Sequence, residues 1–261
     1  MSNGTDDVGA VRATATSFEI LEYLQQRGYS SLSTIADELD IAKSTVHRHL
    51  KTLEQLEYIV GDADEFAVGL RFLGLAEAAR SRGDAVQLAR EKTTELAAET
   101  NERAQFVVEE HGYGVCVSRA TGDHAVETAP QLGSRMPMHA TAAGKAILAF
   151  ESEERVKQIL EERRLDPVTS ESITDEATLY EELATIREQG YAVNREEHIA
   201  GLTAFGAPVR RRDGSVVGAF SISGPTNRFT DPEKEREIAT LLLGTTNELE
   251  LNIAHSVDST P

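Results

Sequence analysis

Apolar residues recur at helical spacing three times within the first sixty positions of the chain. They predict helices over about 13–28, 33–39 and 43–57, the first ending at a glycine and the second preceded by serines that can cap it. The pattern then changes to two short apolar runs within 59–68, which predict a pair of strands around a polar turn. Three helices followed by a strand pair are typical of a winged helix-turn-helix.

The third predicted helix carries the groups that a DNA-reading helix needs. Val46, Leu50 and Leu53 share one face, which leaves polar and cationic residues to meet base edges and phosphates. Alone, such a helix would be an ordinary solvated one, but the flanking helix and strand pair favour DNA binding. We expect the turn at 61–65 to touch the DNA backbone. The residues predicted to bind DNA are Ser33, Thr34, Lys43, Ser44, Thr45, His47, Arg48 and Lys51.

Beyond residue 70 the pattern predicts a larger second domain. Helical periodicity continues over 71–101 with a break near Gly83, and strands and helices then follow in turn. The pair Asp213-Gly214 is a strong hairpin signal, since both residues tolerate the positive φ angles of a type I′ turn. The predicted strands are 105–109, 115–118, 124–128, 204–211 and 216–223, and the predicted helices are 141–150, 153–163, 176–189 and 232–253.

Helices that frame a mostly antiparallel sheet predict an α+β fold for this second half. We expect a winged helix-turn-helix DNA-binding domain at 10–70, a linker helix at 71–83, and a C-terminal ligand-binding and oligomerisation domain at 84–256. The length of 261 residues suits two domains that each bury a core.

The charge of the chain, taken alone, argues against nucleic acid. The sequence has 26 basic and 44 acidic residues, whereas a DNA-binding domain normally presents excess lysine and arginine to phosphate. High acidity without tryptophan is also typical of proteins from salt-loving cytoplasms, so we expect a halophilic protein, from a haloarchaeon. In such a cell the high salt shortens the Debye length to about 3 Å, so repulsion between the acidic protein and DNA and attraction between its cations and phosphates are both screened.

Signatures of catalysis, metal binding and export are weak. Gly144-Lys145 lacks the first glycine and the hydroxyl residue of a phosphate-binding loop, and the histidines lack metal-ligand spacing. Cys116, the single cysteine, lies in an apolar strand pattern that favours a buried thiol, and Glu196-Glu197 is expected to be solvated. We expect a cytoplasmic protein that is not an enzyme and has no membrane partner, metal, catalytic residue or cofactor.

One helix start and one strand can form a small-molecule site. A helix that begins near Thr141 leaves the N–H groups of 142–144 unpaired, and such a helix end binds carboxylates. Ser221 and Ser223 alternate in a strand and therefore project to the same face. The alternative is that these small residues serve tight packing only.

Three runs of the sequence resemble the IclR family of regulators. IAKSTVHRHLKTLEQLEYIV, at 41–60, is similar to the family's recognition helix, while MPMHATAAGKAILA, at 136–149, and the run at 190–229 are similar to its effector-binding domain. The resemblance covers nearly the whole chain. It implies a GAF-like sensory domain, a homodimer or tetramer, double-stranded operator DNA as a partner, and control of catabolic genes by a small organic acid, aromatic acid or sugar-derived metabolite.

The family's effector pocket, carried over by this resemblance, falls on small and polar positions. An acidic residue is common in the family where Asn194 stands and a cysteine where Ala204 stands, so the ligand of a relative does not transfer directly. Glu57 stands where a glycine often ends the recognition helix. With the helix start included, the residues predicted to bind the effector are Ala142, Ala143, Gly144, Asn194, Ala204, Ser221 and Ser223.

Two classes of function remain open at this point. The first is a ligand-responsive, sequence-specific DNA-binding transcriptional regulator. The second is a winged-helix ligand-binding or scaffolding module without specific DNA binding, which the acidic charge favours. Replacing Arg48 or Lys43 with alanine distinguishes the two, because only a DNA reader loses affinity for DNA.

Overall fold

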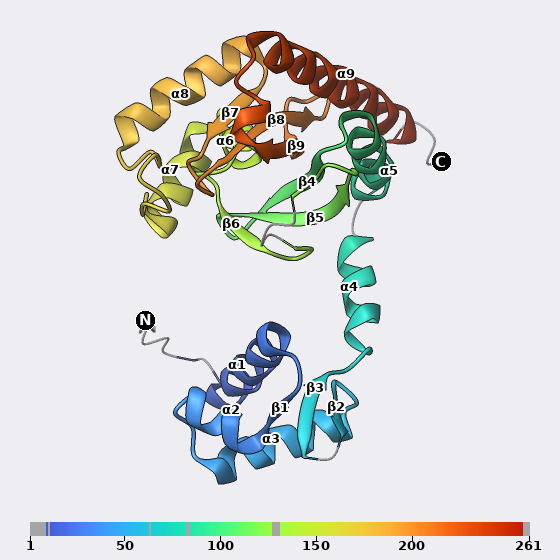
Figure 1. The fold of residues 1–261 in the computed structure, drawn as a ribbon, viewed down its shortest axis with the longest axis vertical. Coiled ribbons are helices and arrows are strands. Elements are labelled where there is room, and N and C mark those ends of the chain that lie inside the picture. The colour runs from blue at the N-terminus through green and yellow to red at the C-terminus, as the bar shows by residue number, and fades with distance from the viewer. Residues whose placement is uncertain (1–8, 10, 63, 82–83, 127–130, 258–261) are drawn as a thin grey trace. The chain divides into compact units, whose positions relative to one another are not determined.

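The chain folds into two compact units, Met1–Ala79 and Arg80–Pro261 (Figure 1). The computed structural model describes residues 9, 11–62, 64–81, 84–126 and 131–257. Helix α4 (Phe72–Arg80), which has no buried residue, lies at the boundary between the units.

The N-terminal unit has the predicted winged helix-turn-helix. Residues that are buried on each helix form a single core, which includes Ile20, Leu24, Ile35, Val46 and Leu50. The sheet of this unit has the order β1-β3-β2. The pattern did not predict β1, because its two residues are too few to show a period. The elements are α1 (Arg12–Arg27), β1 (Ser30–Ser31), α2 (Leu32–Glu38), α3 (Lys43–Gln55), β2 (Ile59–Asp62) and β3 (Glu65–Val68).

Glu57, directly after α3, has a backbone φ of 62°, in the left-handed region that favours glycine. We expect Glu57→Gly to raise the free energy of unfolding of the N-terminal unit by about 0.5–1 kcal/mol, because relief of the strained conformation outweighs the added entropy of the unfolded chain. The ion pair with Arg71, at 3.5 Å, is exposed and adds little. Urea denaturation measures the change. Glu57→Ala removes the same side chain without relieving φ, so an equal gain in both variants would contradict this explanation.

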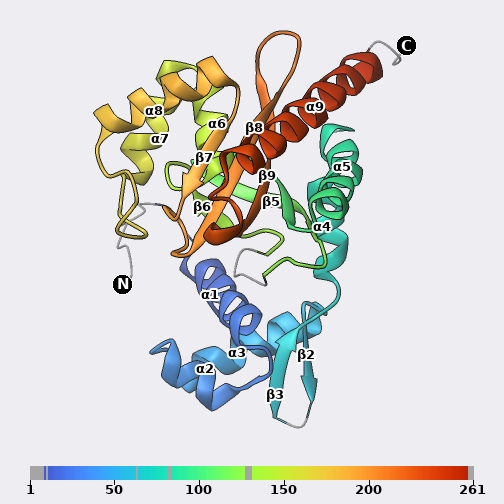
Figure 2. The same cartoon turned by 45° about the horizontal axis from the view of Figure 1, so that its top comes forward.

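The C-terminal unit is built on a six-stranded antiparallel sheet, in the order β6-β5-β4-β9-β8-β7. Helices cover both of its faces, which confirms the α+β prediction and matches a GAF-like domain (Figure 2). The strands are β4 (Arg103–Glu110), β5 (Tyr113–Thr121), β6 (Arg135–Pro137), β7 (Ala192–Arg195), β8 (Leu202–Arg210) and β9 (Val216–Pro225). The helices are α5 (Asp84–Thr100), α6 (Ala142–Phe150), α7 (Glu153–Arg163), α8 (Glu176–Gln189) and α9 (Pro232–Val257), with a 3-10 turn at Thr226–Arg228.

Alternation along the strands divides the side chains between the two helical layers. Phe106, Phe205 and Phe220 point to the face that α5 and α9 cover, where they pack in one apolar cluster. Val107 and Ala219 point to the face that α6, α7 and α8 cover. Polar residues that share this second face therefore lie beneath the N-terminus of α6.

Two sequence predictions about strands need correction. Residues 124–126 form no strand, and residues 127–128 of the strand predicted there lie outside the described residues. The neighbour of β5 is instead β6, whose three residues are too short for a periodic signal. The edge strand β7 was not predicted either, although it pairs with β8 over four residues.

The type I′ turn lies at a different hairpin from the predicted one. At Asp213-Gly214 only Gly214 has a positive φ, 86°, and the Arg211 amide bonds the Ser215 carbonyl at 2.8 Å across a three-residue loop. The I′ prediction there is wrong. Between β4 and β5, however, His111 and Gly112 have φ values of 55° and 77°, which is the two-residue I′ pattern.

Candidate functional site

Helix α3 separates an apolar face from a polar one, as predicted. Val46, Leu50 and Leu53 are buried, while five of the predicted DNA-binding residues of α3 are exposed and Thr45 is half-buried. Ser33 and Thr34, at the start of α2, are also exposed, and the Lys43 Nζ donates to Ser33 Oγ at 3.3 Å. The exposed residues of α3 that were predicted to bind DNA are Lys43, Ser44, His47, Arg48 and Lys51.

The cations of α3 are available to an external anion. Lys43, Arg48 and Lys51 form no ion pair with a carboxylate of the described residues, and Glu54 is the single acidic residue of the helix. The strand pair differs in charge: Asp62, Asp64 and Glu65 surround its turn, and no lysine or arginine occurs within 59–68. Electrostatics therefore favour phosphate contact by α3 and disfavour it at the turn.

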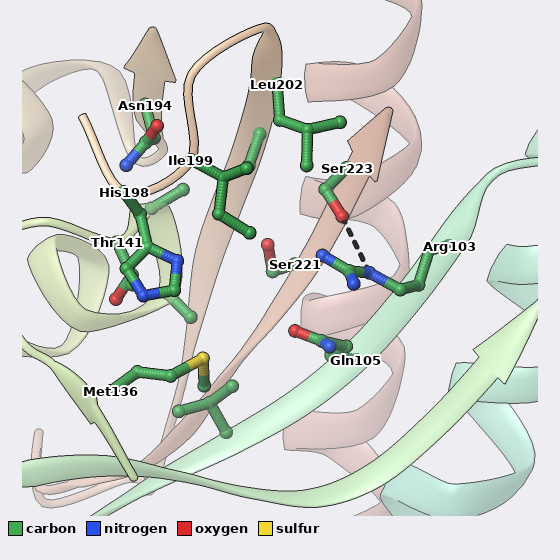
Figure 3. A pocket seen from close by; sticks show the side chains of 14 residues that line it. Arg103, Gln105, Met136, Thr141, Asn194, His198, Ile199, Leu202, Ser221 and Ser223 are labelled. Atoms are coloured by element: carbon green, nitrogen blue, oxygen red, sulfur yellow. Dashed lines mark hydrogen bonds between the residues drawn. The ribbon is translucent and has the colours of Figure 1, made fainter. Parts of the chain in front are cut away.

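A pocket in the C-terminal unit brings together residues from segments far apart in the sequence. It contains about 460 Å³ of empty space, a figure that includes open solvent. Six of the seven residues predicted to bind an effector line it: Ala142, Ala143, Asn194, Ala204, Ser221 and Ser223. The other lining residues are Arg103, Gln105, Val107, Met136, Thr141, His198, Ile199 and Leu202 (Figure 3).

Gly144, the seventh residue, does not line the pocket. Its amide donates to the Thr141 side chain, the N-cap of α6, at 3.1 Å, so the prediction of an unpaired amide is wrong at this position. A Cβ added to Gly144 would lie 2.2 Å from the Met138 carbonyl oxygen. Gly144 therefore serves close packing, and the amides of 142–143 are the donors of the first turn that remain for a ligand.

Two buried donors of β4 face the pocket from the sheet. Arg103 pairs in register with Ser223, and Gln105 with Ser221, so these four side chains share one face of neighbouring strands. Arg103 Nε donates to Ser223 Oγ at 3.1 Å. Figure 3 shows Arg103 and Gln105 reaching in from one side, and His198 and Thr141 from the opposite side.

Burial changes the ionisation of the pocket residues. Burial, together with the nearby charge of Arg119, lowers the pKa of Arg103 to about 10, so Arg103 remains cationic at neutral pH. Burial, with repulsion from Arg103 and His139, lowers the pKa of His198 below its usual value. His198 therefore favours its neutral form, and Arg103 supplies the charge of the pocket.

Asn194 helps to build the wall of the pocket. Its Nδ2 donates to the Ala140 carbonyl, and its Oδ1 accepts a hydrogen bond from the Glu197 amide at 3.2 Å. An aspartate, the residue common in the resembling family, could not donate the first of these bonds. The amide thus ties β7 to the segment that leads into α6.

Lys145, which is only 1 % exposed, also connects segments of the pocket wall through hydrogen bonds. Its Nζ donates to Glu197 Oε1 at 2.7 Å, to the Val193 carbonyl at 2.8 Å and to Glu182 Oε1 at 3.0 Å. These bonds join α6 to α8 and to the segment after β7, which carries His198 and Ile199 into the pocket wall. The expectation that Glu197 is solvated is wrong, because the residue is 7 % exposed.

Among the pocket residues that are outside the predicted effector-binding set, Arg103, Gln105 and His198 are polar side chains that the sequence analysis did not single out. A charged residue in an apolar strand is a signal for Arg103, since Arg103, Gln105 and Val107 alternate onto one face. Nothing local in the sequence indicates His198, whose place depends on the loop between β7 and β8. No group of three metal-ligating side chains occurs within the described ranges, and no helix there is long and apolar enough to span a membrane.

Comparisons with known proteins agree with this two-part architecture. Residues 14–63 match the family described as IclR helix-turn-helix domain, and residues 77–250 match the family described as bacterial transcriptional regulator IclR C-terminal. The chain is 32% identical over 247 residues to the probable HTH-type transcriptional regulator ArcR of Halobacterium salinarum, covering 93% of this chain and 94% of the relative. It is 33% identical over 215 residues to the HTH-type transcriptional repressor AllR of Escherichia coli K12, covering 81% and 79%. The crystal structure of the Thermotoga maritima IclR is similar in fold, with a TM-score of 0.80, 27% identity, and coverage of 93% and 98%.

Proposed function

The chain belongs to the IclR family of transcriptional regulators, and from this premise we propose that it controls a catabolic gene set by binding operator DNA in response to a small organic acid or sugar-derived metabolite. The observation that carries the proposal is the convergence of four distant segments on one pocket, in a chain whose other unit exposes a cationic helix. The relatives compared are regulators, and we propose a cytoplasmic protein without catalysis.

On this proposal α3 enters the major groove. Its exposed residues Ser44, His47 and Arg48 would reach base edges, while Lys43 and Lys51 would contact phosphates. The start of α2, with Ser33 and Thr34, would add backbone contacts, and Thr45 would contribute at the edge of the helix. We do not expect the turn between β2 and β3 to contact phosphates, because acidic residues surround it.

Self-association through the N-terminal unit fits the same proposal. An apolar groove on this unit is lined by residues that include Phe18, Leu56, Phe72 and Leu75, and Phe18 and Leu75 are 56% and 54% exposed. Apolar surface of this kind is typical of protein interfaces. A homodimer would present two α3 helices to a roughly palindromic operator, and ligand binding would change their placement through α4, provided that the two states bind the ligand differently.

The test is binding of the purified full chain to its own upstream intergenic DNA and to a scrambled control, from low to molar potassium chloride, with a panel of small acids and sugars. We expect Arg48→Ala to weaken specific binding about 10- to 100-fold, because one base contact supplies roughly 1–3 kcal/mol of discrimination. Lys51→Ala is expected to weaken binding to all sequences and to lower the salt slope by about one.

Arg27→Ala, in the last turn of α1, is the matched control and is expected to leave operator affinity unchanged. A folded wild-type protein without specific binding at any salt concentration would reject the regulator in favour of a scaffolding module. Specific binding that one compound shifts would support the proposal and identify the effector class.

A further inference from the structure

Two polar side chains in the pocket have donors without acceptors. Arg103 and Gln105 are each 5 % exposed, yet Arg103 Nη1 and Gln105 Nε2 have no hydrogen-bond partner. Arg103 also has no carboxylate within salt-bridge distance among the described residues. A buried cation without a counter-ion raises the free energy of the folded state, so a ligand that supplies an acceptor for these donors would be bound favourably.

The charge of the pocket limits what that acceptor is. Arg103 is the one charged side chain among the 14 lining residues, since His198 favours its neutral form. One buried positive charge is matched by one negative charge on the ligand. A dianion would find no second cationic side chain in the pocket for its second charge.

The pocket offers two places for that negative charge, and they differ in strength. The N-terminus of α6 carries the equivalent of about half an elementary charge, with the amides of 142–143 as donors. The guanidinium of Arg103 carries a full charge and a planar fork of donors that matches a carboxylate. Gln105 Nε2 adds a donor on the same strand face.

We propose that Arg103 and Gln105 anchor the carboxylate of the effector, so that a monocarboxylate binds with its anionic group against β4 and β9 and a neutral hydroxyl or carbonyl oxygen at the N-terminus of α6. The inference rests on the proposed function, in which this pocket holds the effector. It makes Arg103 the residue that determines specificity for an acid over its uncharged analogue.

The experiment measures ligand binding to the full chain by thermal shift and calorimetry at constant ionic strength. The probes are lactate, glycolate and glyoxylate, the neutral lactamide and glycolamide, and the dianion malonate, each at up to about 100 mM so that a weak fit is still detected. We expect the monocarboxylates to stabilise the wild type, the amides to have no effect, and malonate to bind more weakly than the monocarboxylates.

Arg103→Met is the decisive variant. It is expected to lower the affinity for the monocarboxylates at least about 30-fold. Without ligand it is expected to be at least as stable as the wild type, because it removes a buried charge that has no counter-ion. The control, Arg155→Met, removes an arginine of α7 that is paired with Glu109 of β4, and should leave ligand affinity unchanged.

The outcomes separate this inference from the proposed function. Unchanged ligand affinity in Arg103→Met, equal binding of acids and amides, or no stabilisation by any acid would each overturn the anchor. The proposed function is tested separately by operator DNA. If lactamide releases the wild type from its operator, the regulator stands and the anchor fails. If Arg103→Met does not fold, the comparison of acids with amides on the wild type decides.

Discussion

Replacing Lys145 with methionine is expected to lower the free energy of unfolding of the C-terminal unit by about 3–5 kcal/mol, because removal of one partner leaves buried carboxylates without a cation. The side chain of Glu197 is 10% exposed and that of Glu182 33%, so water compensates only in part. The Val193 carbonyl loses a donor as well. Thermal and urea denaturation of the full chain, monitored on the C-terminal unit, measures the loss.

Lys157→Met is the matched control for Lys145→Met. Lys157 lies on α7 and approaches Glu161 at 3.9 Å, with both side chains more than two-thirds exposed, so we expect a change within about 0.5 kcal/mol. The double variant Lys145→Met with Glu197→Gln should regain part of the stability, since it removes one of the stranded charges. A loss below about 1 kcal/mol in Lys145→Met would show that these contacts do not hold α6 to the segment after β7.

Gly144→Ala is expected to destabilise the same unit by about 3 kcal/mol, near the upper end for overpacking a core. The new methyl group would lie 2.2 Å from the Met138 carbonyl oxygen and 2.6 Å from Thr141 Oγ1. The first contact is with backbone, which cannot rotate away, so α6 must move from the turn that precedes it. Because this turn and helix form one wall of the pocket, ligand affinity should fall as well.

Gly244→Ala provides the opposite result from the same substitution. Gly244 lies within α9, and nothing comes within 4 Å of an added Cβ. Alanine is the better helix former, so this variant should be more stable than the wild type by about 1 kcal/mol. If both glycine variants changed stability in the same direction, local packing at Gly144 would not be the cause.

The sequence predicts those elements whose residues interact locally. Helices α1, α3, α6, α7 and α8 are confirmed within a few residues, since each carries several turns of apolar spacing. The strands β1, β6 and β7 are not predicted, because two to four residues show no period and pairing alone makes them strands. The type I′ prediction at Asp213-Gly214 is wrong for a different reason. The dipeptide permits a type I′ turn, but the hairpin has a three-residue loop, and a type I′ turn belongs to a two-residue loop.

The pocket residues also divide into those that a local pattern predicts and those that depend on contacts between distant segments. Ala142 and Ala143 could be predicted from a helix start, and Ser221 and Ser223 from alternation in one strand. The family resemblance adds Asn194 and Ala204, whose neighbours in space are distant in sequence. The roles of Lys145 and Glu197 depend on contacts 52 positions apart, which no local pattern contains.

Because the pocket holds an isolated guanidinium and α3 exposes cations, salt is expected to act on effector binding and on DNA binding in different ways. On the proposed anchor, a dissolved carboxylate must approach a chain with a net charge of −18 before it meets Arg103, so repulsion slows its arrival in dilute buffer. Added salt shortens the range of that repulsion to about 3 Å near 1 M, but screens the buried pairing much less. The same salt weakens the contacts of α3 with phosphates. Rising ionic strength is therefore expected to speed capture of the effector while it weakens binding to the operator.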